Sequence, residues 1–394
     1  MNKSKNKLIR INWYRIPLEK DVLHTLHKKN NLRGLLHSLA HITLVGFFGY
    51  IAVLFFINGQ WGYFLIAFWA QGTFGTFLGA AQHELGHGTV FKKKSHNRFF
   101  LNLFSLFTWW NHHHYSMSHT FHHKYTLHPP KDKEVLLPLE PSLKPTLLLQ
   151  LFTFNIQGLI GKLKNTVYTA LGMWFDGPLG GANPEGANPW IKELSIVYPK
   201  KYRLSQRFAR IILAFHGSVL IFAIFTGIWW LPFVLSLWSF TGNWLSYFVG
   251  STQHTGLKDN IPDFRLNTRS VKLHPFIEFL YWHMNWHIEH HMYAGAPGYN
   301  LKKLYETISK DMPEPKTLIQ AWVEMRDTLK KQDQNPNYQY HQKIPTESSL
   351  EKNNTDNLEK YTESIGLLAP EEKINQDAVD KVFKSKFDST RDWR

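Results

Sequence analysis

The chain has 394 residues, a formal net charge of +15 and no cysteine. Without cysteine it can form neither disulfides nor thiolate metal sites, and it cannot carry an iron–sulfur or rubredoxin module of its own. In a soluble protein the positive charge would indicate nucleic-acid binding. The way charge is distributed along this chain indicates a membrane instead, so we expect no nucleic-acid partner.

Two long blocks without charged residues follow a basic N-terminus. Residues 1–33 carry nine lysines and arginines against two acidic residues, whereas 34–82 and 211–257 carry no charged residue at all. A membrane-spanning helix needs about 20 apolar residues, so each block is long enough for two spans. We therefore predict two transmembrane hairpins, with spans at about 38–57, 62–81, 211–230 and 232–250.

The orientation of these hairpins follows from the same charges. Their turns, NGQWG at 58–62 and WWLP at 229–232, carry no charge and are rich in tryptophan, which is typical of the far interface. By the positive-inside rule, both chain ends and the middle segment are expected to face the cytoplasm. The first apolar block is far too long for the core of a signal peptide, so we expect no cleavable one.

The polar segments predict a helical cap on the cytoplasmic side. The apolar runs 99–110 and 146–160 are too short to span and indicate interfacial or buried helices, and the Gly- and Pro-rich run 177–190 indicates a loop. We expect the polar tail to be disordered or loosely docked. The predicted fold is an all-α integral membrane protein in three parts: a basic cytoplasmic arm (1–33), a membrane domain with its cap (34–330) and the tail (331–394).

Three short motifs hold eight of the 22 histidines. HELGH at 83–87 contains two, and HTFHH at 119–123 and HIEHH at 287–291 contain three each. Residues at i, i+3 and i+4 project from one face of a helix, so each H-x-x-H-H motif is predicted to aim three imidazoles at one point. His254, in STQHTG after the second apolar block, is expected at the same membrane edge, because an even number of spans separates it from the motifs.

Nine histidines can therefore converge at the cytoplasmic edge of the membrane. Nine nitrogens suit two metal ions with roughly four or five ligands each, and imidazole alone does not distinguish iron, copper, nickel and zinc. The predicted metal ligands are His83, His87, His119, His122, His123, His254, His287, His290 and His291.

HELGH also matches the H-E-x-x-H signature of zinc proteases, in which the glutamate is the general base. Such a site needs three protein ligands and an open position for water, and nine histidines are too many for it. An intramembrane zinc protease is therefore a distant alternative, and Glu84 is expected beside a ligand or as an exposed neighbour. Asp132 and Glu289 could orient ligand imidazoles or be solvated, and Asn285 could hold a metal-bound water.

The three motifs around two apolar blocks resemble the membrane fatty acid desaturase superfamily, which includes hydroxylases and carotenoid ketolases. The resemblance spans roughly residues 35–310, and HMNWHIEHHMYAGAPGYNLKKLYE is similar to bacterial members, some of which act on small amino-acid-like molecules. It implies that the eight motif histidines, with His254 as a ninth, hold two iron ions without haem. Such a centre uses dioxygen and two external electrons to remove hydrogens from an unactivated C–H position.

The resemblance also implies partners and a location. The substrate would be an acyl lipid or a smaller amphiphile in the bilayer, and a hydroxylase or ketolase on the same scaffold is the alternative to a desaturase. Front-end desaturases with their own cytochrome b5 domain usually begin the third motif with glutamine, whereas this chain has His287 and no His-Pro-Gly-Gly haem motif. We therefore expect an external ferredoxin- or cytochrome-type donor and a multi-pass protein of the bacterial inner membrane.

Overall fold

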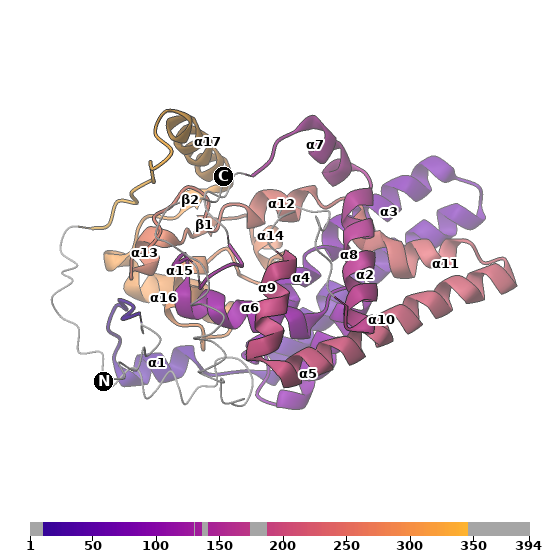
Figure 1. Cartoon of the computed structure of the whole chain (residues 1–394), viewed down its shortest axis with the longest axis horizontal. Helices are drawn as coiled ribbons and strands as arrows, with labels where there is room; N and C mark the ends of the chain where they lie inside the picture. Colours follow the sequence, from indigo (N-terminus) through magenta and orange to yellow (C-terminus); the bar gives the residue numbers. More distant parts are fainter. Residues whose placement is uncertain (1–10, 130, 136–140, 174–186, 346–394) are drawn as a thin grey trace, which may run out of the picture.

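The computed structural model describes residues 11–129, 131–135, 141–173 and 187–345 (Figure 1). This part of the chain is mostly helical, as predicted. Its single sheet pairs two short parallel strands, β1 (Val271–Lys272) and β2 (Lys316–Thr317), with Val271 opposite Lys316. A helical architecture is expected for a protein that places much of its backbone in lipid, because helices satisfy their own backbone hydrogen bonds.

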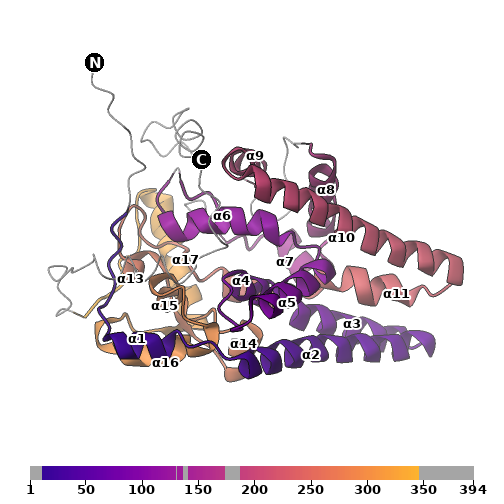
Figure 2. The same cartoon turned by 90° about the horizontal axis from the view of Figure 1, so that it is seen from below.

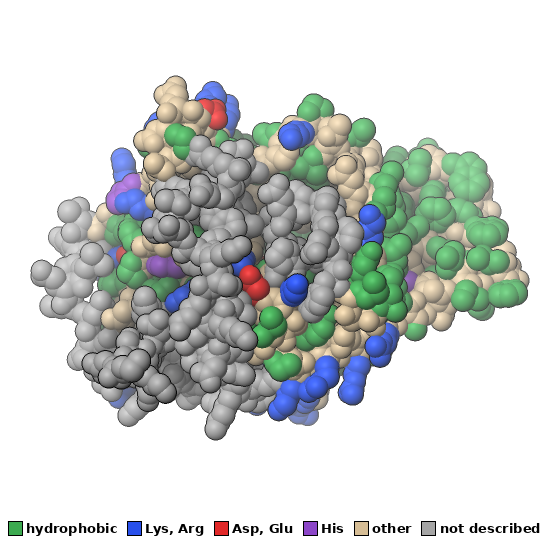
Figure 3. All heavy atoms as spheres, viewed as in Figure 1, with side chains coloured by type: hydrophobic (Ala, Val, Ile, Leu, Met, Phe, Trp, Pro, Cys, Tyr) green, Lys and Arg blue, Asp and Glu red, His purple; other side chains and the backbone are tan. Residues whose placement is uncertain are grey.

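Among the described residues, three helical stretches are long and apolar enough to cross a membrane. They are Lys20–Ile57, which contains α1 (Lys20–Leu26) and α2 (Asn31–Ile57); Trp61–Gly86, which contains α3 (Trp61–Gly75) and α4 (Leu78–Gly86); and α10 (Pro199–Thr226). Hydrophobic side chains cover the end of the molecule where α2, α3, α10 and α11 lie, and no charged side chain is visible there in that view (Figure 3). This end is the part of the surface suited to lipid.

The predicted fourth span at 232–250 is wrong as a continuous helix. The chain runs through α11 (Trp230–Pro232), a π-helical turn η1 (Phe233–Leu237) and a 3₁₀ turn η2 (Trp238–Phe240), and it resumes as α12 (Trp244–Gly250). In the described part of this segment, the stretch Trp230–Phe240 forms a shorter apolar helix.

Tertiary hydrogen bonds replace helical ones at this break. The Thr241 hydroxyl and the Gly242 N–H both donate to the Thr153 carbonyl, at 2.8 and 3.1 Å, and the Asn155 N–H donates to the Phe240 carbonyl at 2.6 Å. Gly242 has a φ of +62°, and a Cβ at this position would lie 2.7 Å from the Trp69 carbonyl oxygen. Only glycine fits such a position. The helix therefore ends where this segment contacts Thr153 and Trp69.

The remaining helices of the middle segment refine the sequence predictions. The run 99–110 corresponds to α5 (Lys94–Phe107), which buries Phe100 and Phe104. The run 146–160 forms two helices instead of one, α7 (Pro145–Phe152) and α8 (Ile156–Leu171), which meet at the corner that bonds to Thr241. Most of the predicted loop 177–190 lies outside the described residues, and its last positions begin α9 (Ala187–Val197).

Most of the remaining helices, together with α1, lie toward the end of the molecule away from α11 and form a cap (Figures 1 and 2). The cap consists of α1, α6 (His112–Tyr125), α13 (Phe264–Asn267), α14 (Pro275–Leu280), α15 (His287–Met292), α16 (Gly298–Ile308), η3 (Ser309–Asp311) and α17 (Leu318–Gln334). Trp13 and Leu23 of the N-terminal segment share its apolar core with Phe264 and Trp286. The predicted domain boundary at residue 33 stays a prediction, as does the disorder of the tail, most of which lies outside the described residues.

Two histidines of the apolar helices are held by hydrogen bonds. His41 accepts from the Trp282 indole at 2.9 Å and contacts the Phe74 carbonyl at 3.0 Å. His216 contacts the Ser236 hydroxyl at 2.8 Å and the Leu106 carbonyl at 2.9 Å. Both rings are thereby satisfied within the protein, which is what a polar group among apolar helices requires.

Candidate metal centre

The nine predicted ligand histidines form two groups. Within each group, one ring nitrogen from every histidine lies within 4.8 Å of the others. The five-histidine group contains His83, His87, His119, His123 and His290, and the four-histidine group contains His122, His254, His287 and His291. No other cluster of potential ligands occurs among the residues that the structure describes.

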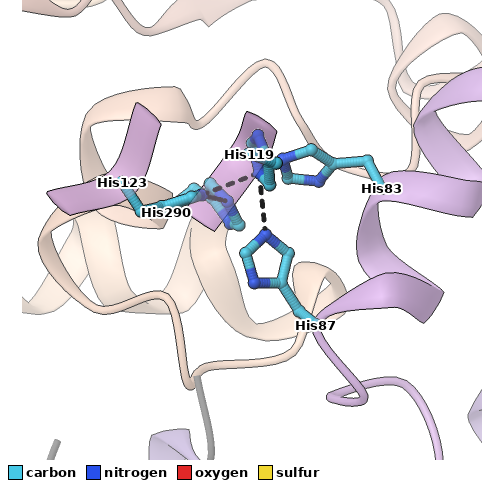
Figure 4. Close-up of side chains that lie close together, drawn as sticks. All are labelled: His83, His87, His119, His123 and His290. Atoms are coloured by element: carbon cyan, nitrogen blue, oxygen red, sulfur yellow. Dashed lines mark hydrogen bonds between the residues drawn. The ribbon is translucent and has the colours of Figure 1, made fainter. Parts of the chain in front are cut away.

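The five-histidine group takes its members from α4 with its C-cap, α6 and α15, and Figure 4 shows the five side chains close together. His83 lies on α4 and His87 caps its C-terminus, because the long helix that begins in the apolar block ends here. The His119 Nε2 lies 3.1 Å from the His87 Nε2 and 2.9 Å from the His123 Nε2, and the His123 Nε2 lies 3.2 Å from that of His290. Helices α4, α6 and α15 therefore direct their imidazoles to one point.

The four-histidine group lies beside it and draws on α6 and α15 again. The His287 Nε2 lies 3.2 Å from the His254 Nε2 and 3.1 Å from the His291 Nε2. His254 stands on a turn after α12, and its ring centroid is 5.0 Å from that of His122. The two groups touch where the His123 and His291 rings stack with centroids 4.5 Å apart.

The prediction that each H-x-x-H-H motif aims three imidazoles at one point is wrong. On α6, His119 and His123 belong to one group and His122 to the other; on α15, His287 and His291 share a group without His290. Successive residues of an α-helix are rotated by about 100°, so the i and i+4 side chains lie together while the side chain at i+3 points elsewhere. Each of these two motifs therefore supplies a pair of histidines to one group and a single histidine to its neighbour.

The donor sets fit bound metal ions. Two ligands at right angles around one ion, each about 2.1 Å from it, are separated by about 3 Å, which is the Nε2–Nε2 spacing found here. The His83 Nε2 is buried without a hydrogen-bond partner in the described structure. One group offers five nitrogen donors and the other offers four, which agrees with the predicted division between two ions. Imidazole nitrogens are ligands that iron accepts.

Hydrogen bonds on the outer nitrogens fix the orientation of several rings. The Nδ1 of His122 lies 2.9 Å from Asp132, that of His254 lies 2.9 Å from the Asn267 carbonyl, and that of His291 lies 3.2 Å from the Thr126 hydroxyl. An Nδ1–H donated outward leaves the Nε2 lone pair facing the group, which is the tautomer that binds a metal.

Two carboxylates hold rings of the five-histidine group in the same way. Glu84 is buried, with Oε1 3.2 Å from the His83 Nδ1 and 3.5 Å from the His290 Nδ1, and its other oxygen accepts from the Gly298 N–H at 2.9 Å. Glu134 Oε1 lies 2.8 Å from the His119 Nδ1. Both oxygens of Glu84 are thus engaged by the protein, an arrangement that does not suit the general base of a zinc protease.

Glu289 and Asn285 are buried but contact other groups than the sequence suggested. Glu289 accepts from the Ser270 hydroxyl at 2.6 Å, and the Asn285 amide donates to the Val271 carbonyl at 2.9 Å. Both bonds connect the α15 region to the strand segment beside it. That Asn285 holds a metal-bound water stays a prediction.

Sequence reasoning missed Glu134 and Tyr115. The Tyr115 hydroxyl lies 3.1 Å from the His119 Nδ1, and its position four residues before His119 on α6 was a readable signal. Glu134 follows Asp132 by two residues in a loop, where spacing does not predict direction. The backbone carbonyl of Asn267 carries no sequence signal at all.

Electrostatics favours neutral imidazoles in most of the centre. Burial holds the pKa of His119 and of His287 well below the usual value, and neighbouring imidazoles lower it further. For His122, burial opposes the charged form, but the charge and hydrogen bond of Asp132 outweigh it and raise the pKa. Burial raises the pKa of Glu134 to about 7. Neutral imidazole is the form that binds metal, so the rings are prepared for ligation at neutral pH.

Comparison with known proteins agrees with this geometry. The fatty acid desaturase family model matches residues 59–322, which is more than half of the chain and includes all nine histidines. Searches of curated proteins and of solved structures found no match. The matched region begins at the first apolar turn and ends in α17, so it covers α3, α4 and α10 and most of the cap, whereas α2 lies before it. The chain belongs to the fatty acid desaturase family.

Proposed function

We propose that this protein is a membrane-bound diiron oxygenase that uses dioxygen and two electrons to desaturate an unactivated carbon–carbon bond of a lipid or acyl-type substrate. The observation that carries the proposal is the division of nine buried or nearly buried histidines into adjacent groups of five and four. Family membership supports a membrane oxidoreductase with a non-haem diiron centre.

The nine histidines would be the iron ligands. Iron bound there would supply the activation of dioxygen and the removal of hydrogen from the substrate. Asp132 and Glu134 hold the Nδ1 protons of His122 and His119, and Glu84 does the same for His83. Each ring therefore keeps its Nε2 directed inward as the charge of the centre changes.

The surroundings favour an apolar substrate and an external donor. His83 lies near the end of the helical stretch Trp61–Gly86, which is apolar and long enough to cross a membrane, so this one stretch connects the apolar part of the protein to the histidine groups. The chain has no cysteine for an iron–sulfur module. Electrons would come from a separate ferredoxin- or cytochrome-type protein.

The membrane topology is part of the proposal. Two hairpins would cross the bacterial inner membrane, the second completed by the broken segment α11–α12, with the termini and histidines in the cytoplasm. The basic residues of 1–33 and the charge-free turns support this orientation.

Metal content tests the centre. Elemental analysis of the detergent-purified protein should give about two irons per chain, and His290→Ala should lower this to about one, because it removes a ligand of the five-histidine group. His24→Ala is the matched control, since His24 is an exposed histidine of α1 outside both groups. About one zinc per chain that His290→Ala leaves in place would overturn the proposal in favour of a protease.

Product analysis tests the reaction. Acyl chains of a bacterial host that expresses the protein, compared with those of a host expressing His290→Ala, should gain double bonds that mass spectrometry detects. Gain of hydroxyl groups instead would assign the protein as a hydroxylase on the same scaffold.

A further inference from the structure

His254 is the one ligand histidine in the described structure that stands on a turn instead of on or at the end of a helix. The turn follows α12 and precedes α13, and a turn has no repeating backbone hydrogen bonds to fix the direction of a side chain. Its geometry must therefore come from tertiary contacts.

Arg269 supplies such contacts on both sides of His254. Its guanidinium donates to the Thr252 carbonyl and, at 3.1 Å, to the Thr255 carbonyl, and its backbone N–H donates to the Gln253 carbonyl at 2.8 Å. The Arg269 side chain is only 1% exposed. One buried residue thus holds three carbonyls of the turn that carries the ligand.

Arg269 is itself held in place by Glu324 of α17. One carboxylate oxygen of Glu324 accepts from the Arg269 Nη2 at 2.6 Å and from its Nε at 3.1 Å, and the other pairs with Lys316. Burial lowers the pKa of Arg269 to about 10, so the guanidinium is still charged at neutral pH and needs its buried partner.

Other residues of α17 and of the segment after it also contact the turn that carries His254 or the helix that leads into it. Trp322 donates to the Phe248 carbonyl in α12 at 2.8 Å, which fixes the helix that leads into the turn. Gly256 has a φ of +73°, and a Cβ there would lie 2.8 Å from the Thr328 Cγ2, so α17 packs directly on the backbone. The Tyr340 N–H donates to the Gly256 carbonyl at 2.7 Å.

We propose that Arg269 and Glu324 are positioning residues for the four-histidine group, and that α17 with residues 335–342 is a clamp that sets the direction of His254. Glu324 lies beyond the residues that the family model matches, so the clamp adds to what family membership implies. The inference rests on the proposed function, because it assumes that His254 binds iron.

Two substitutions weaken the contact between Arg269 and Glu324 from its two sides. Glu324→Gln keeps an acceptor for Arg269 but removes the negative charge. Arg269→Lys keeps the positive charge but loses the planar fork that reaches two carbonyls and the carboxylate together. Asp327→Asn on the same helix is the matched control, since Asp327 pairs with Arg326 and both side chains are exposed.

The test measures iron content and the Mössbauer spectrum of the ⁵⁷Fe-loaded protein, with His254→Ala as the reference. Glu324→Gln and Arg269→Lys should lower iron from about two to about one per chain and remove the same spectral component as His254→Ala. A higher iron(II) concentration during loading should restore that component in these two variants. Asp327→Asn should keep both irons.

Two irons with an unchanged spectrum in both variants would overturn the clamp, as would loss of both irons together with helical circular dichroism. If the wild-type protein itself holds no iron pair, the failure belongs to the proposed function.

Discussion

The two histidine groups differ in what carries their ligands. Every member of the five-histidine group lies on α4, α6 or α15 or caps one of them, so helix geometry alone nearly fixes the ring directions. The four-histidine group includes one histidine on a turn, His254, which long-range contacts hold. Helix direction places the histidines of the first group, whereas the second also depends on the contacts that hold the turn at His254.

The largest expected effect tests whether both groups are needed. His123→Ala and His287→Ala each remove a ligand, one from each group, and each should lower dioxygen consumption by the dithionite-reduced protein at least about 100-fold, since even outer partners of ligands typically contribute 10–100-fold. Oxygen uptake is measured with an electrode on iron-loaded protein. Near-normal uptake in either variant would mean that one group works alone.

A smaller effect compares the carboxylates that serve the two groups. Asp132→Asn removes the charge opposite His122 and should lower iron affinity about 10–100-fold. Glu134→Gln should cost only a few-fold, because the Tyr115 hydroxyl also contacts the His119 Nδ1 and burial already raises the pKa of Glu134 to about 7. Iron titration against a chelator measures both, and the reverse ranking would contradict the comparison.

The smallest effect is on the pH dependence of stability. Burial raises the pKa of Glu289 from 4.5 to about 7, so the folded state binds this proton more tightly than the unfolded state. The stabilisation that the Glu289 proton gives the folded state is complete below pH 4.5 and is lost as pH rises through about 7. Glu289→Gln removes this titration and keeps a partner for Ser270. Between pH 5 and pH 8, the Tm of the metal-free wild type should therefore fall by a few degrees more than the Tm of the metal-free variant.

Thermal unfolding in detergent at the two pH values measures the effect. The same pH dependence in both proteins would mean that Glu289 is ionised throughout in the folded state.

Sequence reasoning selected the candidate ligands through local spacing. The i, i+3 and i+4 pattern of HTFHH and HIEHH marked a helical face, and the apolar block before His254 marked its place along the chain. The assignment of His122 to one group and His123 to the other depends on where α4 and the turn at His254 lie in space. Glu134 was not predictable because a loop has no period.

The fold shows the same limit. The apolar blocks predicted α2, α3 and α10, because length and composition decide whether a helix can cross a membrane. The break at Thr241 arises from hydrogen bonds to Thr153, which is 88 residues away along the chain. Hydropathy does not register such partners, so a continuous fourth helix was predicted where two pieces occur.

That break has a consequence for the order in which the chain folds. The corner between α7 and α8 is synthesised long before residues 240–242, yet the Asn155 N–H finds its acceptor only in Phe240. The corner must therefore stay hydrated, or at the membrane surface, until the second apolar block has been made. Contacts this distant in sequence are slow to form, which makes closure of this corner a late step that joins the two halves of the protein.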